Sequence, residues 1–136
     1  MAQNNPAKDI RDTLVNDDGV TTPIYIGSEP ASPDDVITIY NTGGDAPSPK
    51  HLLDYPTLQV RSRANTYVDA YDNLLEVFDF LLGRSAFTKN TTVYTGIVAT
   101  TSIFEVGSDD NERRILAANF KLFVEPAYSS QNRKSL

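Results

Sequence analysis

The chain has 136 residues, of which 40% are hydrophobic and 22% charged, so it is long enough to form one domain with its own core. It contains no cysteine and a single histidine, which excludes disulfides, cysteine nucleophiles and zinc sites built on several imidazoles of one chain. We expect one domain over residues 1–136, with flexible ends at about 1–5 and 129–136.

The charge and the hydropathy pattern limit the possible partners. The formal net charge of −6 argues against broad binding to DNA phosphates, which needs basic patches. The acidic surface either aids solubility or suits a channel through which DNA slides without sticking. The first residues lack the apolar core of a signal peptide, and no apolar run reaches the roughly 18 residues of a membrane span. We therefore expect a protein made in a cytoplasm that does not enter a membrane.

The first third of the chain predicts one helix and two strands. Residues 6–16 form the helix, because a proline suits its first turn and Gly19 suits a left-handed cap just beyond its end. Residues 22–26 are a strand candidate. A loop rich in Gly, Ser, Pro and Asp follows at 27–34, and 35–41 is a stronger strand because its residues favour β structure.

The middle of the chain predicts a long loop, a strand and the clearest helix. Turn-forming residues run through 41–56, a length that is usually functional or disordered. Residues 57–63 alternate between apolar and polar, as a half-buried strand does. An amphipathic helix then begins at Asn65 or Thr66 and ends near Leu82.

The last third predicts a long hairpin. Residues 91–106 form one strand, 107–111 the turn and 113–125 the return strand. One face of the return strand is apolar, and the other is mixed and faces solvent or a neighbouring subunit. The fold class is therefore α+β: a mostly antiparallel β-sheet with a long C-terminal hairpin and two helices packed on one face. The mixed face carries Ile115, Ala117, Asn119, Lys121 and Phe123.

Two carboxylate pairs are candidates for acid–base catalysis or metal binding. Asp34 and Asp35 precede a strand, and Asp109 and Asp110 lie in a turn, where aspartate is common for conformational reasons. No second group at defined spacing accompanies either pair, and the EF-hand spacing is absent. Turn chemistry is favoured for both pairs.

The remaining motifs also give no catalytic signature. Gly43 and Gly44 lack the Lys and Ser/Thr of a phosphate-binding loop. His51 could be combined with Ser48 and a nearby aspartate, but no nucleophile elbow is present, so a surface histidine is favoured. We expect no cofactor, no metal site and no enzymatic activity.

Four arginines mark polar positions on the predicted sheet. Arg61 and Arg63 alternate with apolar residues on one strand, and Arg113 and Arg114 open another. They form either a solvated face with salt bridges or an inter-subunit contact, because arginine pairs bidentately with carboxylates and is enriched at interfaces. The sequence leaves both readings open.

A resemblance to a known family rests on the middle of the chain. A β-rich segment at 35–44 ends in Gly-Gly, and a Pro-x-apolar-Gln-apolar-Arg-x-Arg strand follows within 55–63. An amphipathic helix beginning near a tyrosine then occupies 64–83. This arrangement resembles the minor capsid and tail-terminator proteins of long-tailed double-stranded DNA phages.

The resemblance implies a virion protein that forms a ring, usually a hexamer, at the head-proximal end of the tail tube. Such a ring ends tube polymerisation and offers the surface for head joining, and DNA passes through its lumen without specific binding. The implied partners are further copies of the chain, the tail-tube protein and a head-completion or connector protein. The candidate interface residues are Arg61, Arg63, Gly43, Gly44, His51, Arg113 and Arg114.

Three other functions remain open from the sequence. A head-completion or stopper protein shares the small size and would bind the portal-adaptor assembly instead of the tail tube. A monomeric binding module would lack a ring interface. A small enzyme would need a deep polar pocket with convergent titratable groups.

Overall fold

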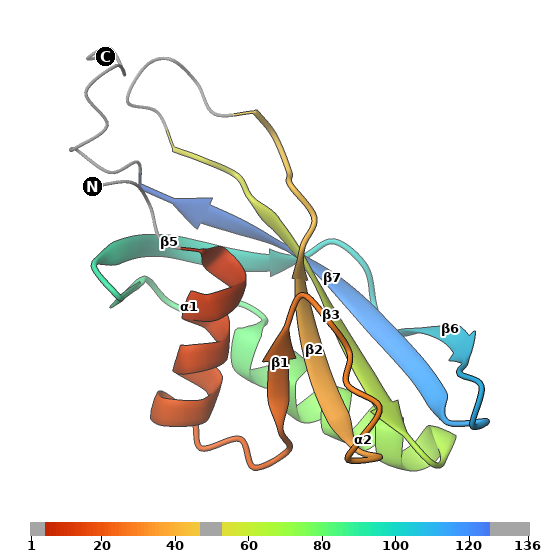
Figure 1. The fold of residues 1–136 in the computed structure, drawn as a ribbon. Coiled ribbons are helices and arrows are strands. Elements are labelled where there is room, and N and C mark those ends of the chain that lie inside the picture. The colour runs from red at the N-terminus through yellow and green to blue at the C-terminus, as the bar shows by residue number, and fades with distance from the viewer. Residues whose placement is uncertain (1–4, 47–52, 126–136) are drawn as a thin grey trace.

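Strands from every part of the chain join one curled sheet in the computed structural model, which describes residues 5–46 and 53–125 (Figure 1). The strand order is β1-β2-β3-β7-β5-β4, and β6 also pairs with β7. All pairings are antiparallel except β1 with β2. The strands are β1 (Ile24–Ile26), β2 (Val36–Asn41), β3 (Thr57–Ala64), β4 (Phe87–Lys89), β5 (Thr92–Ala99), β6 (Phe104–Ser108) and β7 (Arg114–Val124).

The first helix follows the sequence prediction with one irregularity. Helix α1 spans Pro6–Asp12 and continues as a π-helical turn, η1, over Thr13–Asp17. The Asn5 side chain caps it by accepting a 3.0 Å hydrogen bond from the Ala7 N–H. The helical segment thus ends just before Gly19, which has a positive φ of 73° as a left-handed cap requires.

The second helix lies across the middle of the sheet. Helix α2 spans Tyr67–Leu81, and the Thr66 hydroxyl caps it by accepting from the Asp69 N–H at 3.2 Å. A stripe of buried side chains on α2 packs against β3 and β7, because residues three and four apart share one face of a helix. The stripe consists of Ala70, Leu74, Val77 and Leu81.

Both helices pack on the same face of the sheet, and the core lies beneath them. Alternate residues of the central strands point to this face, as the pleat requires. Phe78 of α2 meets Phe120 of β7 with ring centroids 5.4 Å apart. The α+β class, the mostly antiparallel sheet and the helices on one face are therefore confirmed. The core side chains from the sheet include Ile37, Ile39, Leu58, Val60, Leu116, Ala118, Phe120 and Leu122.

The C-terminal hairpin is confirmed, but its first arm is not one continuous strand. The predicted strand at 91–106 is divided into β5 and β6, which pair with different parts of β7. At the break, the Thr101 hydroxyl accepts a 3.0 Å hydrogen bond from the Asn119 N–H, in place of a backbone carbonyl. The turn also lies later than predicted, because β6 continues to Ser108.

Strand β4 and its turn were not predicted. Asn90 and Thr91 both have positive φ and reverse the chain between β4 and β5. The Asn90 amide donates to the carboxylates of Asp9 and Asp12 on α1, and the buried Tyr94 hydroxyl also donates to Asp9. Burial, followed by the neighbouring Asp9 carboxylate, raises the pKa of Tyr94. These contacts fix the curled edge of the sheet to α1.

The parallel pairing of β1 with β2 forces the connecting loop across the sheet. Parallel neighbours need a crossover connection, which must pass over one face. Loop 27–35 makes this crossing in front of the strands in Figure 1, whereas α2 lies behind them. The loop therefore covers part of the face that carries no helix.

Candidate functional site

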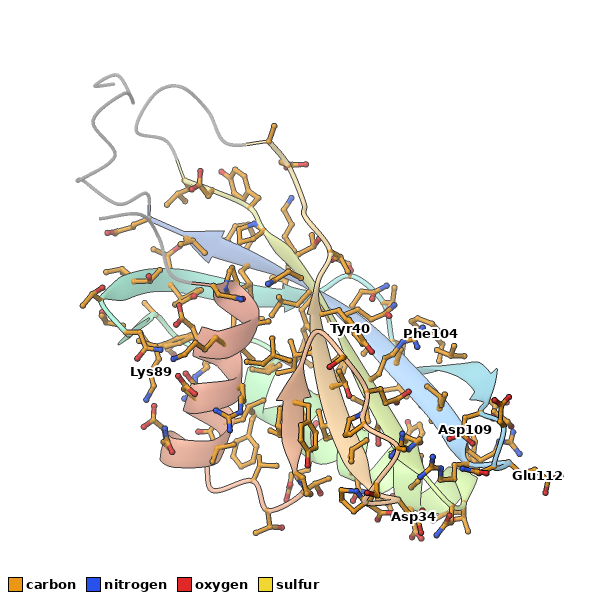
Figure 2. The ribbon with its side chains drawn as sticks, in the orientation of Figure 1. Asp34, Tyr40, Lys89, Phe104, Asp109 and Glu112 are labelled. Carbon is orange, nitrogen blue, oxygen red and sulfur yellow. The ribbon has the colours of Figure 1, made fainter. Side chains whose placement is uncertain are left out.

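The sheet face opposite the helices is the candidate functional site. We call its uncovered part the open face, and cross-strand register places its side chains in three rows. Figure 2 labels Tyr40 and Phe104, which lie on the side of the sheet turned away from α2. The open face consists of Tyr40, Thr57, Gln59, Arg61, Val98, Phe104, Asn119 and Lys121.

A polar ladder orders the centre of the open face. Gln59 donates to the Asn119 Oδ1 at 3.1 Å, and the Arg61 Nε donates to the Gln59 Oε1 at 3.0 Å. The Arg61 guanidinium also lies over the Tyr40 ring, 5.7 Å from its centroid. Within residues 5–46 and 53–125, Arg61 forms no ion pair with a carboxylate. Its charge is positioned but not neutralised.

Tyr40 is half-buried on the same face. Burial raises the pKa of the Tyr40 hydroxyl, and the Glu29 carboxylate raises it further, whereas Arg61 opposes the shift. The hydroxyl therefore stays protonated at physiological pH. This surface offers a neutral hydroxyl and a cation side by side, which suits recognition of a carboxylate.

Lys121 extends the positive charge toward the end of the sheet. Its ammonium lies 5.0 Å from the centroid of the Tyr55 ring and 6.0 Å from that of Phe123. Its one ion-pair partner among the described residues is the exposed Asp45, at 4.0 Å. Aromatic rings hold the cation in place and leave it half-exposed.

Arg63 occupies a different environment from Arg61. It is 2% exposed and donates to three backbone carbonyls of the crossing loop. The distances are 2.5 Å to the carbonyl oxygen of Pro30, 2.6 Å to that of Pro33 and 3.2 Å to that of Asp34. The planar guanidinium suits this role because its donors diverge in a fixed fork. Arg63 clamps the loop onto the sheet.

Arg113 completes the clamp from the next strand. It is 5% exposed and donates to the Ala31 carbonyl at 2.7 Å, to Asp34 at 3.1 Å and to Asp109 at 2.8 Å. Burial alone raises the pKa of the Asp109 carboxyl, but the Arg113 and Asn111 hydrogen bonds outweigh it and lower that pKa. The clamp therefore joins loop 27–35 to the turn of the β6–β7 hairpin.

The other predicted interface residues lie apart from one another. Arg114 pairs with Glu105 beside the hairpin and belongs to the helix-covered side of the register. Gly43 and Gly44 follow β2, and a Cβ on Gly44 would lie 2.3 Å from the Tyr55 carbonyl oxygen, so this position requires glycine. His51 lies outside the described residues. The predicted set thus divides into the open face, the clamp, a glycine turn and an edge pair.

The carboxylate pairs serve turns and contacts between elements. The Asp109 carboxylate accepts from the Asn111 and Arg113 N–H groups within its turn. Asp34 accepts from Asn65, and Asp35 accepts from Asn73 on α2 at 3.4 Å. In the part of the chain that the structure describes, no three metal-ligating side chains gather into a site. Asp109 thus has the turn role favoured from the sequence, whereas Asp34 and Asp35 join separate elements.

Across residues 5–46 and 53–125, none of the helices combines the length and apolarity needed to cross a bilayer.

Comparison with known proteins assigns the class. The sequence pattern of the family described as bacteriophage tail terminator protein matches residues 11–126, which include every strand of the sheet. The chain is therefore a structural protein of a phage tail. It belongs to the bacteriophage tail terminator family, and its place is the virion, at the junction of tail and head. The resemblance to tail terminators is confirmed, and this family is one of structural proteins rather than enzymes.

Solved structures share the fold at low sequence identity. A chain in the virion of a native gene transfer agent particle superposes with a TM-score of 0.66 and 12% identity, covering 88% of this chain and 93% of that one. A second solved chain, without a functional description, has a TM-score of 0.57 and 11% identity and covers 88% of this chain and 94% of its own. No curated protein sequence matches. At these identities the likeness establishes the fold alone.

Sequence reasoning identified the mixed face of β7 and the polar face of β3, with Gln59 and the arginines, but missed the outer strands of the open face. Tyr40, Val98 and Phe104 were not singled out, because they belong to three strands whose order the sequence did not give. Alternation on each strand was the available signal. Only the register between strands brings these residues together.

Proposed function

We propose that the protein forms a ring on the head-proximal end of the tail tube, where it ends tube polymerisation and provides the surface to which the head joins. The observation that carries the proposal is the family match over residues 11–126, which spans the whole sheet, the π-helical turn η1 and helix α2. The partners are further copies of this chain, the tail-tube protein and a head-completion or connector protein.

The surface of the chain is consistent with assembly. Several large apolar side chains remain exposed on two separate elements, α2 and the β5–β6 edge. Isolated apolar residues are ordinary on a surface, but rows of them on regular elements mark interaction sites. A ring subunit needs two such surfaces, one for each neighbour.

In the proposed ring, the lumen does not bind DNA specifically and the chain has no catalytic role. A net charge of −6 lowers the affinity of the ring for DNA phosphates, so DNA passes through without specific binding. The titratable groups of the described residues serve turns, clamps and caps, and we propose no catalytic role for them.

The test uses the purified full-length chain and its cognate tail-tube protein. Tube protein alone should polymerise to a broad length distribution. Added chain should shorten the tubes in proportion to its concentration, with extra density at one tip in electron micrographs. Unchanged tube lengths combined with binding to the portal-adaptor assembly would instead identify a head-completion protein.

A further inference from the structure

An apolar stripe runs along the exposed flank of α2. Val68 and Leu75 lie seven residues apart, close to two helical turns, so they share one flank of the helix, and Leu82 follows directly after its last residue as the C-cap. Val68 is 63% exposed, Leu82 is 52% exposed and Leu75 is 37% exposed. These side chains are separate from the buried stripe that packs on the sheet. Along the described chain, nothing covers them.

The same flank carries carboxylates without cations. Asp72 and Asp79 lie four residues after Val68 and Leu75, which places them beside the apolar stripe. Helix α2 contains no lysine, arginine or histidine. Neither carboxylate forms an ion pair among the described residues. The flank is thus apolar with an acidic border.

The open face has the opposite character. Val98 and Phe104 are exposed on it, and Arg61 and Lys121 are its cations. Among the described residues, Lys121 pairs with Asp45, whereas Arg61 has no carboxylate partner. The open face is thus apolar with a basic border, complementary in charge and in apolar character to the α2 flank.

We propose that the α2 flank of one copy docks on the open face of the next copy, and that this contact forms the subunit interface of the ring. The inference rests on the ring function proposed above and names the surfaces that build it. In the interface, Asp72 and Asp79 of one copy face Arg61 and Lys121 of its neighbour, and the apolar side chains lie between them.

The placement of the two surfaces favours head-to-tail contacts. Helix α2 lies on one side of the sheet and the open face on the other (Figure 1). A two-fold pairing of α2 with its own copy would oppose two acidic flanks, and like charges at an interface cost several kcal/mol. A heterologous contact leaves one free surface at each end, so repeated addition produces a ring if the rotation closes.

Site-directed crosslinking tests the contact directly, because the native chain has no cysteine. Leu75→Cys and Phe104→Cys are made as separate chains that differ in mass. Under mild oxidation, the mixture should give mainly the mixed disulfide dimer, and each variant alone should give little. A prevailing Leu75→Cys homodimer would overturn the inference, as would no crosslink under conditions in which rings form.

Charge reversal gives a second, independent readout. Arg61→Glu should weaken self-association at least about 100-fold, as should the double variant Asp72→Lys with Asp79→Lys. A mixture of the two should associate more strongly than either alone, because Arg61→Glu keeps an intact α2 flank, the double variant keeps an intact open face, and the two reversed surfaces are again opposite in charge. The controls are Lys89→Glu on β4 and Asp110→Lys with Glu112→Lys in the hairpin turn, which should assemble as the wild type does. Equal assembly of all variants would overturn the inference.

Failure of the inference and failure of the function give different results. If the wild-type chain shortens tail tubes but the crosslink and charge-reversal results are negative, the ring uses other surfaces and the inference is wrong. If the mixed crosslink forms but tube lengths never change, the interface stands and the capping function is wrong.

Discussion

Arg61 and Arg63 lie two residues apart on β3 and on the same face of the sheet, but their surroundings are opposite. Arg63 is buried under loop 27–35 and donates to three of its backbone carbonyls. Arg61 is half-buried, is held by Gln59 and Tyr40, and keeps a charge that no described carboxylate neutralises. Arg63 therefore stabilises the fold, whereas Arg61 carries an unpaired charge at the surface of the sheet.

The difference arises from how far the crossing loop reaches. It covers the sheet at the level of Val36, Arg63 and Ile115, which pair across β2, β3 and β7. Arg61 lies in the neighbouring cross-strand row, which the loop does not cover and in which Phe104 of the edge strand β6 is exposed. Two residues along the strand therefore separate a buried structural cation from the open face that we propose as an interaction surface.

Removal of the Arg63 side chain should have the largest effect on stability. Arg63→Ala leaves three loop carbonyls without a charged donor, so we expect a loss of about 3 kcal/mol in the free energy of unfolding. Denaturant unfolding measures it. Arg63→Lys should recover only part of the loss, because an ammonium cannot reproduce the fork. Equal stability of Arg63→Ala and the wild type would contradict the clamp.

Removal of Arg113 should have the second largest effect. Arg113→Ala loses one loop carbonyl and the Asp34 and Asp109 carboxylates, and about 2 kcal/mol is expected because two of these partners can turn to water. Hydrogen exchange should then show faster opening at both loop 27–35 and the hairpin turn. Arg114→Ala is the matched control and should change little, because Arg114 is next in sequence and its one ion-pair partner among the described residues is Glu105.

The pH dependence of stability should report the Asp109 contact. The pKa of Asp109 is lower in the folded chain than in the unfolded chain, so the unfolded chain binds its proton first as the pH falls. The stabilisation is therefore complete above the ordinary value of about 3.9 and is lost at lower pH. Asp109→Asn should flatten this acid limb in unfolding curves measured from neutral pH to about pH 3. If Asp109→Asn leaves the loss of stability at acid pH unchanged, the Asp109 hydrogen bonds are not the cause of that loss.

Substitution of Arg61 should have the smallest effect on stability. It is the direct counterpart of the Arg63 substitution two residues away on the same strand. Arg61→Ala removes a surface ladder contact, so the free energy of unfolding should stay within about 0.5 kcal/mol of the wild-type value. Circular dichroism melts of the monomeric chain at low concentration measure it. A loss in the free energy of unfolding comparable to that of Arg63→Ala would mean that Arg61 also stabilises the fold, so the two arginines would not differ in role.

Local sequence patterns were sufficient for most of the elements. The spacing of apolar and acidic side chains along α2, the caps at Asn5 and Thr66, and the alternation on β3 each reflect short-range geometry, so they could be predicted from the sequence. The family could be recognised for the same reason, since its motif is a local succession of strand, turn, strand and helix.

Only the tertiary structure shows which polar side chains of the sheet are covered by another segment and which are exposed. Alternation places Arg61 and Arg63 on one face but does not reveal what other segment covers that face. The parallel pairing of β1 and the path of loop 27–35 settle it, and both depend on contacts between residues distant in sequence. The sequence alone was enough to predict most of the elements, the sheet class and the family. Only the packing of loop 27–35 buries Arg63 and leaves Arg61 half-exposed. The burial of a side chain depends on which distant segments pack over it, and the sequence of its own strand does not specify those segments.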